Sequence, residues 1–149
     1  MTSVSVIKLV VEKCQEIPEE YLVALSNPQK VFEVVTAITG IQDSPSEEFW
    51  VLLLNIKNKI TGVEMISKGS LNSAIVHPRE VFKSAILHNS ASVIFAHNHP
   101  SGDPEPSIED IHLTRRLEDG GRLLGIEVLD HIVVGDGVFT SMKQRGLMS

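Results

Sequence analysis

Two histidines one residue apart, followed by a serine and an aspartate at helical spacing, are the residues of this chain best suited to chemistry. His97 and His99 lie in the segment AHNHPSGDPEPSIED, in which Ser107 and Asp110 follow. Residues two apart in a strand project from the same face, so the two Cα atoms would lie about 6.5–7 Å apart, a span that two imidazoles can close around one ion. Asp110 comes three residues after Ser107 and therefore faces the same way in the first turn of a helix.

Two neutral imidazoles and one carboxylate form an open zinc site, in which the fourth position is left for water. The sequence therefore predicts that His97, His99 and Asp110 bind one catalytic Zn²⁺ ion. Zinc held in this way lowers the pKa of its water to about 7 and polarises a carbonyl group as a Lewis acid. The predicted chemistry is thus hydrolysis.

A general base close to the reacting water is the remaining requirement. Glu64 has the most suggestive surroundings, because it lies between two apolar residues of a predicted strand and Gly62 before it leaves room for backbone or substrate to approach. A carboxylate in a partly apolar setting has a raised pKa, closer to the range that a base needs. Spacing alone does not exclude Glu80 or Glu109.

Each part of the pattern also has a simpler interpretation. Ser107 and Asp110 match the common S-x-x-[DE] helix-capping pattern, and two histidines at a strand end can be mere polar groups at a sheet edge. Their joint occurrence on either side of a short, proline-rich loop favours the metal site. Rival sites lack their residues: the tripeptide HNH is not the spread-out nuclease motif, a zinc deaminase needs more than one cysteine, and HExxH is absent.

The elements that must position these residues alternate between strands and helices. Apolar strands are predicted at 49–56, 60–67, 91–99 and 125–137, and helices at 27–39, 77–89 and 107–121, the last ended by its two glycines. Strands interleaved with helices predict a sheet covered by helices, of the α/β or α+β class. The polar stretch 40–48 separates a short N-terminal extension, residues 1–45, packed on the domain, from the main domain, residues 46–149. The opening residues 1–13 are predicted as a first strand or a short helix.

Composition is that of a soluble globular protein, with 149 residues, 42% hydrophobic and 21% charged. No apolar run approaches the ~18–20 residues of a membrane span, and no signal peptide opens the chain. The single cysteine, Cys14, excludes an internal disulfide, fits a reducing cytoplasm and is predicted to be a buried small hydrophobe. The net charge of −6 weighs against sequence-independent binding to nucleic-acid phosphates. We therefore expect a cytoplasmic protein without a membrane segment.

The pattern H-x-H-x7-S-x2-D, formed by His97, His99, Ser107 and Asp110, resembles the metal motif of JAMM proteins. With GSLNSAIVHPREVFKSAI before it and RLLGIEVLDHIVVG after it, the chain resembles the RadC-type branch of the JAB/MPN superfamily from the polar stretch to its C-terminus. The resemblance implies a mixed, mainly antiparallel sheet flanked by helices, of cytidine-deaminase-like architecture, and one zinc ion held by two His and one Asp. It also implies that Glu64 is the catalytic base and that Ser107 supports the oxyanion of the tetrahedral intermediate.

Three functions are compatible with this resemblance. The favoured hypothesis is a zinc metallopeptidase that hydrolyses a peptide or isopeptide bond in a protein or peptide substrate. The second is an accessory protein of DNA repair or mobile elements that acts on or near nucleic acid. The N-terminal helix-hairpin-helix region of longer RadC proteins has no match in the first ~45 residues, and the acidic charge agrees with its absence. The third is a non-catalytic MPN scaffold, which has no need of a complete ligand set. A homodimer is a further expectation.

Overall fold

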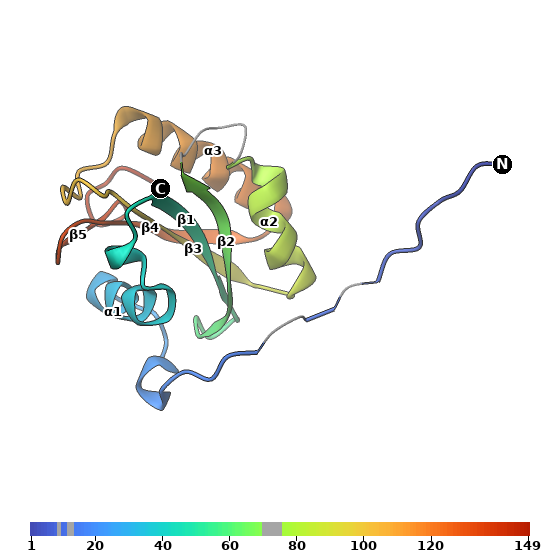
Figure 1. The fold of residues 1–149 in the computed structure, drawn as a ribbon, viewed down its shortest axis with the longest axis horizontal. Coiled ribbons are helices and arrows are strands. Elements are labelled where there is room, and N and C mark those ends of the chain that lie inside the picture. Colours follow the sequence, from blue (N-terminus) through green and yellow to red (C-terminus); the bar gives the residue numbers. More distant parts are fainter. Residues whose placement is uncertain (9, 12–13, 70–75) are drawn as a thin grey trace.

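The computed structural model describes residues 1–8, 10–11, 14–69 and 76–149 (Figure 1). The strands are β1 (Glu47–Leu54), β2 (Ile60–Gly69), β3 (Ser92–Asn98), β4 (Glu127–Val134) and β5 (Phe139–Ser141). The helices are α1 (Pro28–Thr39), α2 (Pro78–Leu87) and α3 (Ile108–Leu124), with two short 3-10 helices, η1 (Glu19–Tyr21) and η2 (Ile41–Asp43). Each predicted strand and helix after residue 26 is present, and β5 is an addition.

The strands form one sheet in the order β2-β1-β3-β4-β5. β1 pairs antiparallel with both β2 and β3, β4 pairs antiparallel with β5, and β3 and β4 are parallel. The predicted mixed, mainly antiparallel sheet flanked by helices is therefore confirmed. β3 lies at the centre of the sheet, and all of its residues are buried.

Helices cover both faces of the sheet, α2 and α3 on one and α1 on the other (Figure 1). Alternate strand residues divide between the two sides, so that Phe49 and Val51 pack with α2 and α3 while Leu52 and Leu54 pack with α1. The two cores together hold the sheet between layers of apolar side chains. The division of the chain at residues 45 and 46 stays a prediction.

The longest helix, α3, runs past the point where the sequence suggested that it ends. Gly120 and Gly121 lie inside it, and the helix stops at Gly125, whose φ of 72° is left-handed. A Cβ at Gly121 would collide with the carbonyl oxygen of Ile126 and crowd Phe82. The glycines therefore let α3 lie close to α2 and β4 rather than end it, and the predicted end was wrong. No helix in the described ranges is long and apolar enough to cross a membrane.

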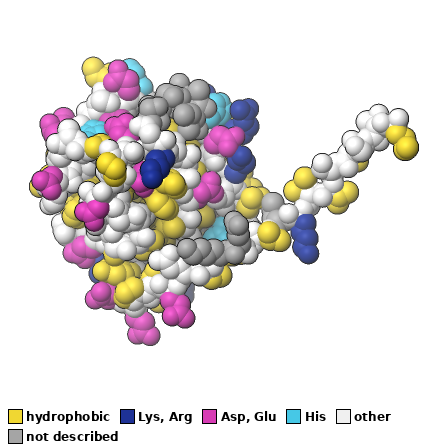
Figure 2. Space-filling model, in the orientation of Figure 1, with side chains coloured by type: hydrophobic (Ala, Val, Ile, Leu, Met, Phe, Trp, Pro, Cys, Tyr) yellow, Lys and Arg dark blue, Asp and Glu magenta, His cyan; other side chains and the backbone are white. Residues whose placement is uncertain are grey.

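The N-terminal residues extend away from the domain (Figures 1 and 2). The described residues before Glu19 form neither helix nor strand, so the predicted opening strand or helix was wrong for them; residues 9, 12 and 13 lie outside the described residues. Cys14 is exposed, contrary to the prediction. The reason is that packing against the core begins after Cys14, with the partly buried Ile17 and Tyr21, and becomes complete only at Leu25 and α1.

Candidate metal centre

His97 is held in the middle of the sheet by its strand. It pairs with Phe49 of β1, is wholly buried, and stacks on the Phe49 ring with centroids 6.3 Å apart. The neighbouring Asn98 projects to the opposite face, where its side chain accepts a hydrogen bond from the Glu48 backbone at 2.7 Å and donates to the Ser46 carbonyl at 3.0 Å. The alternation of the strand thus directs His97 toward α3 while Asn98 anchors the end of β3.

His99 follows β3 directly and continues its pairing, because its backbone N–H donates to the Val134 carbonyl at 2.8 Å. Its Nδ1 lies 2.8 Å from the Asp103 carbonyl oxygen. A carbonyl only accepts, so Nδ1 carries the proton and Nε2 presents a bare lone pair. The tautomer that a metal ligand needs is therefore set by the loop between β3 and α3.

Asp110 reaches the histidines from the first turn of α3. Ser107 accepts a hydrogen bond from the Asp110 backbone at 3.0 Å, and the Asp110 carboxylate accepts one from the Ser107 backbone at 2.9 Å, which forms a capping box. Asp110 Oδ2 lies 3.3 Å from His97 Nε2 and 3.1 Å from His99 Nε2. The capping box that begins α3 also directs the Asp110 carboxylate toward the two histidines. Helix capping and a place in the candidate metal site are therefore compatible for this pair.

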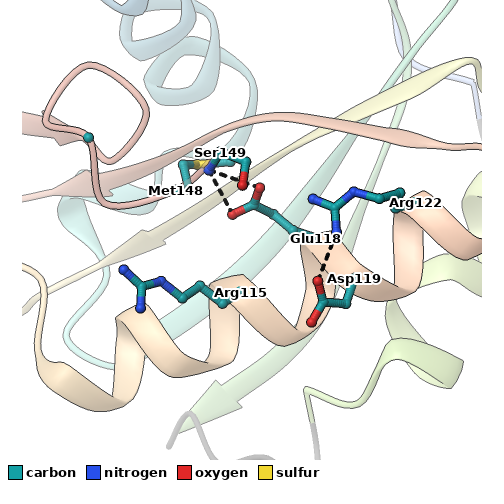
Figure 3. Close-up of a pocket in the computed structure, with 7 residues that line it drawn as sticks. Arg115, Glu118, Asp119, Arg122, Met148 and Ser149 are labelled. Atoms are coloured by element: carbon teal, nitrogen blue, oxygen red, sulfur yellow. Dashed lines mark hydrogen bonds and ion pairs between the residues drawn. The ribbon is translucent and has the colours of Figure 1, made fainter.

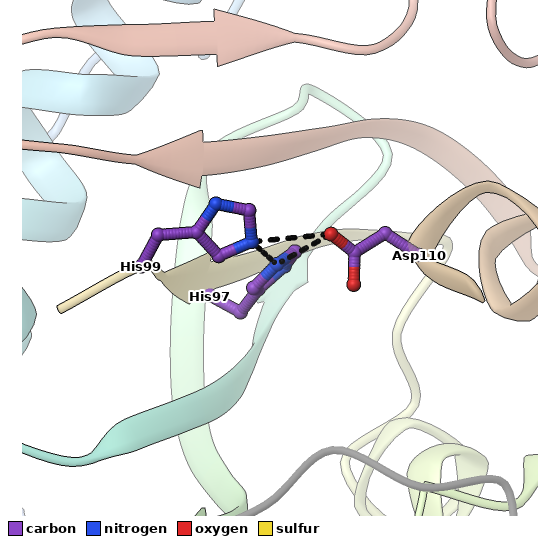
Figure 4. A group of neighbouring side chains, drawn as sticks. All are labelled: His97, His99 and Asp110. Atoms are coloured by element: carbon purple, nitrogen blue, oxygen red, sulfur yellow. Dashed lines mark hydrogen bonds and ion pairs between the residues drawn. The ribbon is translucent and has the colours of Figure 1, made fainter. Parts of the chain in front are cut away.

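The three side chains converge on one point (Figure 4). The two Nε2 atoms are 3.0 Å apart, and each lies 3.1–3.3 Å from Asp110 Oδ2. Ligands of a tetrahedral zinc ion at about 2.0–2.1 Å from the metal are about 3.3 Å from one another. The predicted ligands His97, His99 and Asp110 therefore form a group that is able to bind a metal ion.

Electrostatics keep this group ready for a cation. Burial raises the pKa of the Asp110 carboxyl, but the hydrogen bond and charge of His97 and the N–H of Ser107 outweigh burial and hold that pKa well below its usual value. Burial, with the charge of His97 beside it, holds the pKa of His131 well below its usual value. A carboxylate thus faces imidazoles across the centre, and the ring behind them is neutral.

Sequence reasoning missed two residues behind the ligands. His131 of β4 lies with Nε2 2.7 Å from His97 Nδ1, and its own Nδ1 is 2.6 Å from Thr114 Oγ1. Both residues are wholly buried. The available signal was that Thr114 follows Asp110 by four residues and so shares its helix face.

The two residues predicted for catalysis lie around the group without joining it. Glu64 is half-buried in β2 opposite Val51, whose side chain belongs to the same face of the sheet as that of His97. Ser107 is exposed at the start of α3. Glu80, left open by spacing, is ion-paired with Lys83 at 2.7 Å on the surface of α2. The roles of Glu64 and Ser107 stay predictions.

A polar hollow lies elsewhere, between α3 and the C-terminal residues (Figure 3). Arg122 pairs there with Asp119 at 2.9 Å, and Glu118 accepts the Ser149 backbone N–H at 3.0 Å. Because none of the metal-binding group lines this hollow, it is separate from the candidate metal centre.

Comparison with known proteins assigns the family. Residues 25–147 match the model of the RadC-like JAB domain. The chain is 53% identical over 127 residues to a UPF0758 protein of Symbiobacterium thermophilum, and the matched stretch covers 85% of this chain and 53% of that protein. It is 51% identical over 124 residues to a UPF0758 protein of Methanosarcina mazei, which covers 83% of this chain and 53% of that protein. The chain thus spans about half the length of these curated relatives, and it belongs to the RadC-like JAB domain family.

Proposed function

We propose that this protein is a zinc-dependent hydrolase of the JAMM type that cleaves a peptide or isopeptide bond. The observation that carries the proposal is the convergence of His97, His99 and Asp110, with ligand atoms 3.0–3.3 Å apart. The family match over residues 25–147 supports it. A zinc ion held by these residues would act as a Lewis acid toward the scissile carbonyl and activate water at its open position.

Residues around the centre take the remaining steps of the proposed reaction. Glu64 removes a proton from the attacking water and returns it to the leaving amine. Glu64 pairs with Val51 of β1, which pairs in turn with Phe95 of β3, so Glu64 lies two strands from β3 on the face of the sheet that carries His97. Ser107 Oγ accepts from the Asp110 backbone, and its hydroxyl keeps a proton to donate to the oxyanion.

The acidic character of the surface gives no support to a nucleic-acid function. Asp and Glu side chains are spread over the face shown in Figure 2, and the chain has a net charge of −6. The hydrolase is therefore the one function that we propose.

The test combines metal analysis with hydrolysis of a panel of fluorogenic peptides and isopeptide-linked substrates. Purified without chelator, the protein is expected to contain one zinc ion, which His97→Ala removes. Glu64→Gln is expected to keep the zinc but to lose about 10²–10⁴-fold in kcat, because no base remains to move the proton.

Glu80→Gln is the matched control, because it removes the carboxylate on the surface of α2 that spacing had left open as the base and that pairs with Lys83, and it is expected to keep full activity. Zinc-free protein whose metal content is unchanged by His97→Ala would refute the metal site. Equal losses in Glu64→Gln and Glu80→Gln would refute the assignment of the base.

A further inference from the structure

The tautomer of His97 decides whether it can bind a metal. A neutral imidazole carries one N–H, so ligation through Nε2 requires the proton to be on Nδ1. For His99 the Asp103 carbonyl settles this point. The Nδ1 of His97, however, faces a second imidazole, that of His131, at 2.7 Å. Since an imidazole nitrogen can donate or accept, His131 must have a bare Nε2 before it can accept from His97.

Thr114 is the residue that meets this requirement. Its Oγ1 lies 2.7 Å from the Asp110 backbone carbonyl, which can only accept, so the single hydroxyl proton points there. A lone pair of the same oxygen then faces His131 Nδ1 at 2.6 Å and accepts its proton. His131 Nε2 is left bare and accepts the Nδ1 proton of His97, so that in the metal-bound state the Nε2 lone pair of His97 faces the ion.

Among the residues that the structure describes, no other hydrogen-bond partner of His131 Nδ1 replaces Thr114. Thr114, His131 and His97 are each wholly buried, and the remaining neighbour of Thr114 Oγ1 is the Met142 sulfur at 3.6 Å, a weak acceptor. If the Thr114 hydroxyl is removed, the Nδ1–H that His131 must carry in the metal-bound state loses its acceptor in a dry interior. Such a buried unsatisfied donor disfavours that state.

We propose that His131 and Thr114 are positioning residues that hold His97 in its metal-binding tautomer. The series of hydrogen bonds begins and ends at Asp110. Its backbone carbonyl accepts from Thr114, and its carboxylate lies beside His97 as the third metal ligand. The first turns of α3 thereby position two ligands. They hold Asp110 directly, and they set the tautomer of His97 through Thr114 and His131 of β4. This proposal rests on the metal site of the proposed function and not on any particular substrate.

A matched pair of variants separates this role from packing. Thr114→Val keeps the shape and removes the hydroxyl, whereas Thr114→Ser keeps the hydroxyl and removes a methyl group. Measured by competition with a chromophoric chelator, zinc binding is expected to weaken about 10- to 100-fold in Thr114→Val and to stay within about threefold in Thr114→Ser. If Thr114→Ser loses as much zinc affinity as Thr114→Val, Thr114 acts through packing and the proposal is overturned.

A second measurement needs no variant. Long-range ¹H–¹⁵N spectra of the zinc-loaded protein are expected to show His97 and His131 each protonated at Nδ1; a proton on His131 Nε2 overturns the proposal. Neither measurement uses a substrate. A protein with these tautomers that cleaves no peptide contradicts only the proposed function. A Thr114→Val variant with undiminished zinc affinity, in a protein that loses zinc in His97→Ala, contradicts only this inference.

Discussion

At the scale of single residues, the buried carboxylate of Asp130, next to His131, is held by hydrogen bonds from the strand and the turn beside it. Asp130 accepts hydrogen bonds from the His131 backbone at 2.7 Å, the Ser141 hydroxyl at 2.6 Å and the Lys143 backbone at 3.1 Å. Burial nonetheless outweighs these bonds and raises the pKa of Asp130 above its usual value of 3.8. Asp130 therefore links β4 to β5. Burying its ionised carboxylate costs free energy of folding, and this cost depends on pH.

Asp130→Asn tests this cost. A carboxyl whose pKa is raised by folding contributes stability below pH 3.8, its ordinary value, and that contribution is lost as the pH rises through the raised value. The free energy of unfolding of the wild type, relative to Asp130→Asn, is thus expected to fall as the pH rises from 3.8 toward neutrality. Urea unfolding of both proteins across this range measures it. A difference that grows with pH would show that the hydrogen bonds outweigh burial.

The residues of the metal centre differ in how far the sequence could reveal them. His97, His99 and Asp110 were predicted because strand and helix periodicity places them, and one short loop joins them. His131 and Thr114 were not, because their contacts depend on the parallel pairing of β3 and β4 and on the depth at which α3 packs. Local spacing carries no information on such long-range contacts.

At the scale of elements, the loop between β3 and α3 owes its position to the end of β4. The Asp136 backbone donates to the Gly102 carbonyl at 2.9 Å, and Gly102 has a φ of 92°. A Cβ at Gly135 would collide with that same carbonyl and crowd the Pro104 backbone. The stiff loop was predicted from its prolines, but the support by Gly135 depends on tertiary packing that the sequence does not show.

Gly135→Ala is therefore expected to displace the loop and with it the Asp103 carbonyl that sets the His99 tautomer. We expect zinc binding to weaken about tenfold, by the loss of an outer-shell partner, and the fold to lose about 1–3 kcal/mol through overpacking. Chelator competition and thermal unfolding measure the two effects.

Gly125→Ala serves as the control for this substitution. Its φ of 72° makes any side chain costly, but no atom lies within 4 Å of the added Cβ. It is expected to lower stability and leave zinc affinity unchanged. If both variants weaken zinc binding equally, the effect of Gly135→Ala is one of general destabilisation.

At the scale of the whole molecule, the helices on the two faces of the sheet come from different parts of the chain. α2 and α3 lie between the strands in the chain, whereas α1 comes from the residues before the sheet. Interleaved strand and helix patterns predicted these layers correctly. The strand order was beyond the sequence, since it depends on which edges pair, and the three-residue β5 is too short to have a hydrophobic period.

Two truncations test the contribution of α1. Removing residues 1–15 is expected to change the free energy of unfolding by less than about 0.5 kcal/mol, because the described residues there are exposed. Removing residues 1–45 deletes the buried Val31, Val34, Val35 and Ile41, each worth about 1.5–3 kcal/mol. Since whole domains are stable by only about 5–15 kcal/mol, the shorter protein is expected to lose cooperative thermal unfolding. A cooperative transition in that protein would show that α1 is dispensable.

The place of β3 at the centre of the sheet and of β2 at its edge has a consequence for motion. Edge strands open more readily than strands paired on both sides, and local opening of a fold starts where fewest neighbours hold the chain. His97 of β3 belongs to the part that opens last, while Glu64 belongs to a strand paired on one side in the described part of the sheet. Amide exchange at β2 is thus expected to run ahead of exchange at His97, so that Glu64 moves with a locally opening strand while His97 stays in the closed centre of the sheet.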